Sequence, residues 1–137
     1  MLEADIKVLE AVQQRAIRMT SGLSGSYEEK LRQVGLTNLS ERRIRGDLIQ
    51  TYKILHQVDD LPSSTFFKFA DAHNYPTRLA EVTYTTLNLA NPEPANYDFR
   101  RNFFSHRVVD PWNALPSEVK FATSVNNFKN TYDSYKQ

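Results

Sequence analysis

Arginine is the residue type through which this sequence could act chemically. Basic side chains gather on three predicted helices, and arginine prevails over lysine at these places. The planar guanidinium group can contact two phosphate oxygens at once, and a set of such contacts releases counterions from a nucleic acid. The candidate nucleic-acid-binding residues are Arg15, Arg18, Arg42, Arg45, Lys53, Arg100, Arg101 and Arg107. If packing brings them onto one surface, they would hold a nucleic-acid backbone without reading its bases.

A second interpretation of the same side chains is purely structural. Acidic residues that could pair with them include Glu28, Glu29, Glu41 and Asp47. Exposed ion pairs of this kind contribute little to stability, and such residues would simply form solvated faces. The formal net charge of +1 and the pI near 8.0 do not choose between the two interpretations, because a basic surface would have to come from segregation of charge.

No other catalytic or metal-binding pattern is present in the sequence. His56, His73 and His106 lie far apart, without the paired spacing of a zinc site, and the chain contains no cysteine. There is no nucleophile elbow of the G-x-S-x-G type, and the four glycines are not spaced as a phosphate-binding loop. The sequence therefore predicts a chain that is not an enzyme and that holds no cofactor or metal.

Length and composition predict one globular domain covering residues 1–137. A hydrophobic fraction of 40% and an aromatic fraction of 12% argue against a disordered chain. No apolar run reaches the roughly 20 residues that a membrane span needs, and the first residues carry acids where a signal peptide carries bases. Together with the lack of cysteine, these features predict an intracellular protein, nuclear or cytoplasmic, without membrane contact.

Apolar spacing and capping signals predict two helices in the first third of the chain. The first runs from about Ala4 to Met19 and carries one broad apolar arc. Ser26-Tyr27-Glu28-Glu29 has the spacing of a capping box, and the short helix that it begins is predicted to end at Gly35 in the left-handed conformation. The apolar arc of the first helix comprises Leu2, Ile6, Val8, Leu9, Val12, Ala16, Ile17 and Met19.

A longer helix follows, for which Ser40 is the predicted N-cap and about Gln57 the end. Gly46 lies in its interior, where glycine costs about 1 kcal/mol relative to alanine. Crowding by a neighbouring element is the first explanation for this glycine, and close approach of a ligand is the second. A final helix is predicted from Ser124 to about Tyr135.

The stretch from Asp98 to Pro116 is predicted to anchor the fold. Read as a helix capped by Asp98, it places four large apolar side chains on one face. Pro111 predicts a kink or break near Val109–Asp110, with Asp110 capping a short second turn. The four apolar residues are Phe104, Val108, Trp112 and Leu115.

An alternating, β-branched run from Glu81 to Leu89 predicts one strand. Its partner would lie at about Ala95–Tyr97, or the strand would stand at an edge. Because one strand alone is indicated, a two-layer α/β sheet is not expected. The predicted fold is mainly α, a single compact domain of four or five helices with a small β element.

Three sequence blocks carry a family resemblance. They are L-E-A-V-Q-Q-R-A-I-R-M from Leu9, S-Y-E-E-K-L-R-Q-V-G-L with L-S-E-R-R-I-R-G-D-L-I-Q-T-Y-K-I-L from Ser26, and R-R-N-F-F-S-H-R-V-V-D-P-W-N-A-L-P with S-V-N-N-F-K-N from Arg100. In this order they resemble the C-terminal, post-polymerase region of reverse transcriptases from non-LTR retrotransposons, the CR1/jockey-like LINE elements. Pro111 departs from the family pattern, which usually has an apolar residue there.

The resemblance implies a non-catalytic accessory domain that assists RNA or DNA binding in target-primed reverse transcription. It places the chain after the polymerase, so Phe69-Ala70-Asp71-Ala72 is interpreted as a coincidental likeness to the F-A-D-D motif, whose paired aspartates bind two metal ions. The alternative is a protein-interaction or structural domain that packs on a polymerase body or partner chain without nucleic-acid contact. Its contact residues would be the aromatics Phe66, Phe67, Phe69 and Trp112.

Overall fold

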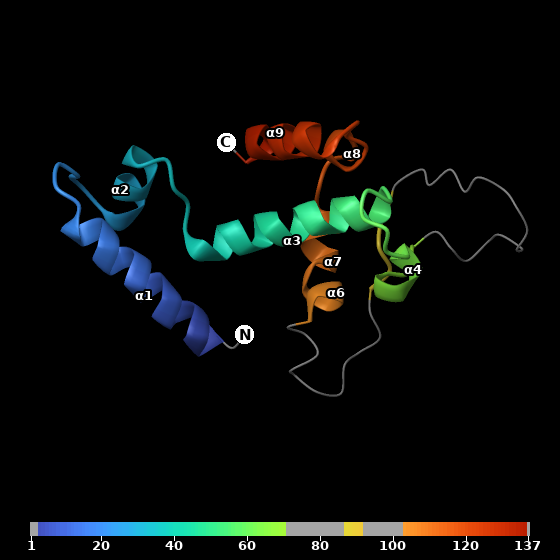
Figure 1. Cartoon of the computed structure of the whole chain (residues 1–137), viewed down its shortest axis with the longest axis horizontal. Coiled ribbons are helices and arrows are strands. Elements are labelled where there is room, and N and C mark those ends of the chain that lie inside the picture. The colour runs from blue at the N-terminus through green and yellow to red at the C-terminus, as the bar shows by residue number, and fades with distance from the viewer. Residues whose placement is uncertain (1–2, 71–86, 92–102, 137) are drawn as a thin grey trace, which may run out of the picture. The chain divides into compact units, whose positions relative to one another are not determined.

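The computed structural model describes residues 3–70, 87–91 and 103–136 (Figure 1). This part of the chain is mainly helical, as the sequence predicts. Its longer helices are α1 (Glu3–Met19), α2 (Tyr27–Gln33), α3 (Leu39–Leu55) and α9 (Val125–Tyr135). Its shorter helices are α4 (Ser63–Phe66), α6 (Phe104–Arg107), α7 (Val109–Asn113) and α8 (Ser117–Lys120). The residues group into two compact units, Met1–Gly46 (unit 1) and Asp47–Gln137 (unit 2). That the whole chain forms a single domain stays a prediction.

In unit 1, α2 has both of the ends that the sequence predicts. The Ser26 hydroxyl accepts a hydrogen bond from the Glu29 N–H at 3.3 Å, and the Glu29 carboxylate accepts one from the Ser26 N–H at 2.7 Å. At the other end Gly35 has a φ of 68°, and the Leu36 N–H donates to the Leu31 carbonyl at 2.9 Å. The capping box and the left-handed glycine are both confirmed.

Polar contacts join the helices of unit 1. The Glu10 carboxylate of α1 accepts from the Tyr27 hydroxyl at 2.6 Å and from the Leu39 N–H at 2.9 Å. The Gln13 amide donates to the Tyr27 hydroxyl at 3.0 Å and to the Thr37 carbonyl at 3.2 Å. Apolar burial adds little, since the buried hydrophobic residues among those described in unit 1 are Ile17 and Leu31.

The start of α3 corrects the predicted N-cap. The Asn38 side-chain oxygen accepts from the Glu41 N–H at 2.8 Å, and the helix begins at Leu39, so the cap is Asn38 and not Ser40. Asparagine and serine are about equally good caps, so sequence alone does not rank them. The Leu39 N–H also binds the Glu10 carboxylate, and this contact with α1 helps to fix where α3 begins.

The interior glycine of α3 is not explained by crowding. A Cβ atom built on Gly46 would meet no described heavy atom within 4 Å. The first explanation offered for this glycine is therefore wrong. No described side chain lies so close to Gly46 that a glycine is needed there.

Unit 2 contains the large hydrophobic core. Trp112 and Phe128 are completely buried, and their rings stack at a centroid distance of 6.1 Å. Phe128 also packs against Tyr52 of α3 at 4.7 Å and Tyr132 of α9 at 6.3 Å. The Tyr52 hydroxyl is satisfied by the Ala122 carbonyl at 2.7 Å. The stretch around Trp112 is therefore the anchor of unit 2. Further core residues are Leu48, Ile54, Phe67, Leu89, Val108, Val109, Leu115 and Val119.

The predicted break in this stretch is present, at Val108. Helix α6 ends before it and α7 begins after it. Pro111 lies in the first turn of α7, where backbone N–H groups have no intrahelical partner and a missing N–H costs little. Asp110 does not cap the second segment, because α7 has no side-chain cap hydrogen bond. The predicted cap Asp98 lies outside the described residues.

The predicted strand is not observed as a strand in the part of the chain that the structure describes. An isolated antiparallel bridge joins Phe69 to Leu89. It is supported by hydrogen bonds from the Ala70 N–H to the Asn88 carbonyl at 2.9 Å and from the Ala90 N–H to the Lys68 carbonyl at 2.7 Å. Residues 81–86 of the predicted strand and its possible partner at 95–97 lie outside the described residues.

The last predicted helix is confirmed. The Ser124 hydroxyl accepts from the Asn127 N–H at 3.1 Å and caps α9, which ends at Tyr135. The apolar face of α9 is buried through Phe128 and Tyr132. These two residues lie four positions apart, so one side of α9 packs on the core.

Candidate nucleic-acid interface

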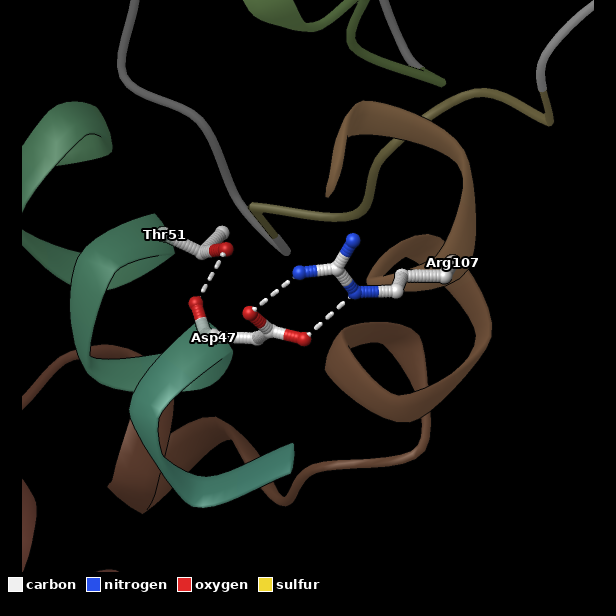
Figure 2. Close-up of polar contacts among 3 residues, drawn as sticks. All are labelled: Asp47, Thr51 and Arg107. Atoms are coloured by element: carbon white, nitrogen blue, oxygen red, sulfur yellow. Dashed lines mark hydrogen bonds and ion pairs between the residues drawn. The ribbon is translucent and has the colours of Figure 1, made fainter. Parts of the chain in front are cut away.

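Arg107 forms an ion pair with Asp47 inside unit 2. Its Nε donates to one oxygen of the Asp47 carboxylate at 2.7 Å and its Nη2 to the other at 2.8 Å (Figure 2). This bidentate geometry is the one that arginine makes best with a carboxylate. Hydrogen bonding to Asp47 raises the pKa of Arg107. The guanidinium joins α6 to α3, so Asp47 already uses its Nε and one Nη donor, and the phosphate contact of Arg107 stays a prediction.

Asp47 is placed for this contact by the helix that carries it. Its backbone carbonyl accepts a hydrogen bond from the Thr51 hydroxyl at 2.9 Å, one turn further along α3 (Figure 2). Thr51 is completely buried, so its hydroxyl needs such a partner. The side chain of Asp47 is 17% exposed and that of Arg107 is 29% exposed. The pair is therefore shielded from solvent on most sides.

Lys53 is also engaged with an acid of unit 2. Its ammonium lies 3.8 Å from the Asp59 carboxylate, and the other Asp59 oxygen accepts from the Gln50 amide at 2.7 Å. Both partners are about one-third exposed, at 33% and 31%. Such a pair is weak and can be exchanged for another anion, so Lys53 is a poorer structural contact than Arg107.

The arginines of unit 1 have a different environment. Arg15 and Arg18 on α1 and Arg42 on α3 are exposed, and none of them forms an ion pair with another described residue. Arg45 is half-buried and makes an interaction of its own. The hydrogen bonds from Glu10 and Gln13 of α1 hold the beginning of α3 against α1, so both helices present their arginines within one unit.

The eight candidate residues are divided between the two units. Arg15, Arg18, Arg42 and Arg45 belong to unit 1, and Lys53 and Arg107 belong to unit 2. Arg100 and Arg101 lie outside the described residues. Eight basic and six acidic residues give unit 1 a formal net charge of +2, whereas nine basic and ten acidic residues give unit 2 a charge of −1. Excess positive charge therefore lies in unit 1.

Lys120 is a buried cation of unit 2 that the sequence does not single out. Lys120 is 4% exposed, and its ammonium donates to the Asn88 side-chain oxygen at 2.7 Å and to the Asn113 carbonyl at 3.0 Å. Burial lowers its pKa. Lys120 is thus a structural residue that holds the Leu87–Ala90 segment beside α7 and α8. Nothing in its sequence neighbourhood distinguishes it from an exposed lysine.

The aromatics proposed as a partner surface lie in or against the core of unit 2. Trp112 is completely buried and donates from its indole N–H to the Leu87 carbonyl at 2.8 Å. Phe67 is 5% exposed, and Phe66 and Phe69 are partly buried against the same core. Trp112 and Phe67 are therefore not available to a partner, because the core of unit 2 already uses them, whereas a partner contact through the half-buried Phe66 and Phe69 stays a prediction.

Other chemistry finds little support in the described residues. No group of three or more histidine, cysteine, aspartate or glutamate side chains is placed to hold a metal ion there. His56 contacts the Lys120 carbonyl at 2.8 Å and stacks on Tyr52, and His73 lies outside the described part of the chain. A shallow hollow beside α2 is lined by Gly25, Glu29 and Gln33, among others. The Glu29 side chain is already used in the capping box, and the Gln33 side chain donates to the Ser24 carbonyl.

None of the helices in the described part of the chain is both long and apolar enough to cross a membrane. No protein-family model, curated protein or solved structure matches this chain.

Proposed function

We propose that this chain is a non-catalytic accessory domain that binds the backbone of RNA or DNA through the arginines of unit 1. The observation that carries the proposal is the exposure of Arg15, Arg18 and Arg42, without an ion pair to any other described residue, on the unit that holds the excess positive charge. Exposed guanidinium groups that have no carboxylate partner can neutralise phosphates and release counterions. No ion pair among the described residues has to be broken first.

The sequence resemblance supports the biological context of the proposal. The blocks from Leu9, Ser26 and Arg100 resemble the post-polymerase region of a LINE-type reverse transcriptase. In that setting unit 1 would help to hold RNA template or DNA target during target-primed reverse transcription, in the nucleus or the cytoplasm. The chain itself would catalyse nothing.

Binding measurements against salt test the proposal. Fluorescence anisotropy with a labelled duplex and a labelled single strand should show binding at low salt that weakens as salt rises. The double variant Arg18→Glu/Arg42→Glu should bind more weakly and reduce the slope of log K against log salt by about 1–2, since each lost phosphate contact removes roughly 0.7–0.9. Absence of binding at low salt, or a slope of zero, would refute the proposal.

A matched control separates specific contacts from net charge. Lys68 and Lys136 are exposed residues of unit 2, so Lys68→Glu/Lys136→Glu makes the same change in total charge at a distance from unit 1 in the sequence. This control should retain most of the affinity. Equal loss in both double variants would mean that the chain senses overall charge and that the unit 1 arginines form no interface.

A second candidate function is protein interaction without nucleic-acid contact. One observation favours it: within unit 1, α1 leaves a row of large apolar side chains exposed, comprising Val8, Leu9, Val12 and Met19. Exposed apolar stripes of this kind commonly mark sites of contact with another protein. The partner surface would then lie on α1, because Trp112 and Phe67 of the predicted aromatic surface are buried in the core of unit 2.

A further inference from the structure

Helix α1 has an inner face that unit 1 uses and an outer face that it does not use. The inner positions recur at i, i+4, i+7, i+8 and i+11 and are the buried or half-buried positions of the helix, namely Ile6, Glu10, Gln13, Gln14 and Ile17. Glu10 and Gln13 fix this orientation, because their hydrogen bonds to Tyr27, Thr37 and Leu39 turn their side of α1 towards α2 and the start of α3. The side opposite them must therefore face outwards.

The outer face is apolar along about three helical turns. Val8 and Val12 are each 64% exposed, Met19 is 79% exposed and Leu9 is 47% exposed. Val8, Val12 and Met19 recur at i, i+4 and i+11, which places them in one row, and Leu9 lies beside that row. The 11 steps from Val8 to Met19 span about 16 Å at a rise of 1.5 Å per residue, the length of a short docked helix.

One edge of this row is basic. On a helical wheel of about 100° per residue, Arg15 directly flanks the row, and Lys7 and Arg18 lie further round on the same side. All three are exposed. The opposite edge carries Leu9 and Ala16, with Asp5 near the N-terminal end, where it makes an interaction of its own. The outer face of α1 is therefore an apolar row with a positive border on one side.

This asymmetry discriminates between possible occupants. In an antiparallel pair of two copies, a twofold axis brings the same edge of both helices together, so Arg15 and Lys7 of one copy would face a basic edge of the other. Like charges placed together disfavour such a pair. In a parallel pair the basic edge would meet the Leu9 edge, which offers no carboxylate beside Arg15. A second copy of this chain is thus a poor occupant.

We infer that the outer face of α1 docks an amphipathic helix of another protein that carries carboxylates along one edge. Its apolar side chains would cover Val8, Val12 and Met19, and its acidic edge would pair with Arg15. This is the recognition mode in which a helix lays its apolar face on a complementary surface, with charge selecting partner and register. The inference deepens the second candidate function and rests on it, and it is independent of phosphate binding by Arg42.

Two synthetic helical peptides provide the probes. Each has about 18 residues, close to the 17 residues of α1, and the same leucine-rich apolar face. One peptide carries glutamate along the edge that meets Arg15 and the other carries lysine. Anisotropy of the labelled peptides against the full chain at low salt should show binding of the glutamate peptide, at least about tenfold tighter than that of the lysine peptide, because like charges at the edge oppose docking.

Variants of the chain locate the surface. Val8→Ser/Val12→Ser should weaken binding of the glutamate peptide about tenfold or more, since two apolar contacts are lost. Both side chains are mostly exposed, so the circular dichroism spectrum and melting temperature should not change. Arg15→Glu should reverse the preference, so that the lysine peptide binds more tightly. Arg42→Glu, a charge reversal on α3, should leave peptide binding unchanged.

The outcomes separate failure of the inference from failure of the function on which it rests. Equal binding of the two peptides, or no reversal in Arg15→Glu, would overturn the acidic-edge partner but leave α1 as a docking surface. If neither peptide binds, both are wrong. Concentration-dependent light scattering of the chain alone, abolished by Val8→Ser/Val12→Ser, would show that the occupant is a second copy and would also overturn the inference.

Discussion

The ion pair between Arg107 and Asp47 allows the sharpest test of the structural role assigned to a predicted phosphate ligand. Fully exposed pairs contribute about 0.2–1 kcal/mol, whereas loss of one partner of a buried pair costs about 3–5 kcal/mol. This pair is bidentate, with side-chain exposures of 29% and 17%, and therefore lies between these limits. We expect Arg107→Met to destabilise unit 2 by about 2–3 kcal/mol, since Asp47 keeps a charge with little access to water.

The opposite replacement should cost less. Asp47→Asn leaves the more exposed partner, Arg107, able to turn to solvent, and keeps a side-chain oxygen as acceptor. We expect a loss of about 1–2 kcal/mol. The double variant should show a coupling energy of about 1–2 kcal/mol, because each single change already removes the contact that the two side chains share.

Urea denaturation followed by circular dichroism measures all four proteins of this cycle. Anisotropy with labelled nucleic acid should show that Arg107→Met binds as the parent protein does. A coupling energy below about 0.3 kcal/mol would mean that the pair is solvated and not structural. A loss of nucleic-acid binding in a folded Arg107→Met protein would return Arg107 to the phosphate surface and refute the role assigned to it.

Three further changes test the local structure, each by chemical or thermal denaturation. Asn38→Ala should cost about 1 kcal/mol as a lost N-cap, while Ser40→Ala, inside the first turn of α3, should change stability by a few tenths at most; equal effects would restore Ser40 as the cap. Gly46→Ala should stabilise α3 by about 1 kcal/mol, since the added Cβ has free space, and a loss of stability would reveal a contact there. Burial lowers the pKa of Lys120, so the unfolded chain binds more protons between that lowered pKa and 10.5, and the free energy of unfolding should rise as pH rises through this window. Compared with the parent protein, Lys120→Met should lack that rise; an identical pH slope would show that Lys120 ionises as a solvated lysine does.

The features that the sequence predicted best are those written within a few neighbouring residues. Both ends of α2 depend on contacts between residues three to five apart, so the spacing of Ser26, Glu29 and Gly35 is sufficient. The break beside Pro111 has the same local origin, because proline acts on the turn that precedes it. The cap of α3 shows the limit of this reasoning, since two good capping residues stand two positions apart and a carboxylate from α1 favours one of them.

Tertiary contacts determine the surroundings of the candidate site residues that the structure describes. Arg107 and Asp47 are 60 positions apart, and no sequence pattern announces that one holds the other. The sequence allowed Trp112 and Phe67 to contact a partner, because the spacing of aromatic residues does not show how deeply each is buried. Lys120 was not singled out for the same reason, since burial of a cation is set by Asn88 and Asn113, which arrive from other segments.

By itself the sequence determined that this chain is mainly helical, where α1, α2 and α9 begin and end, and that its basic chemistry is carried by arginine. These properties follow from periodicity, capping and composition, which act over one or two helical turns. Only the tertiary structure decided which charges are free and which side of α1 is left uncovered. Both properties depend on residues brought together from distant positions, because the neighbours that replace water around a side chain determine whether it is paired, buried or exposed.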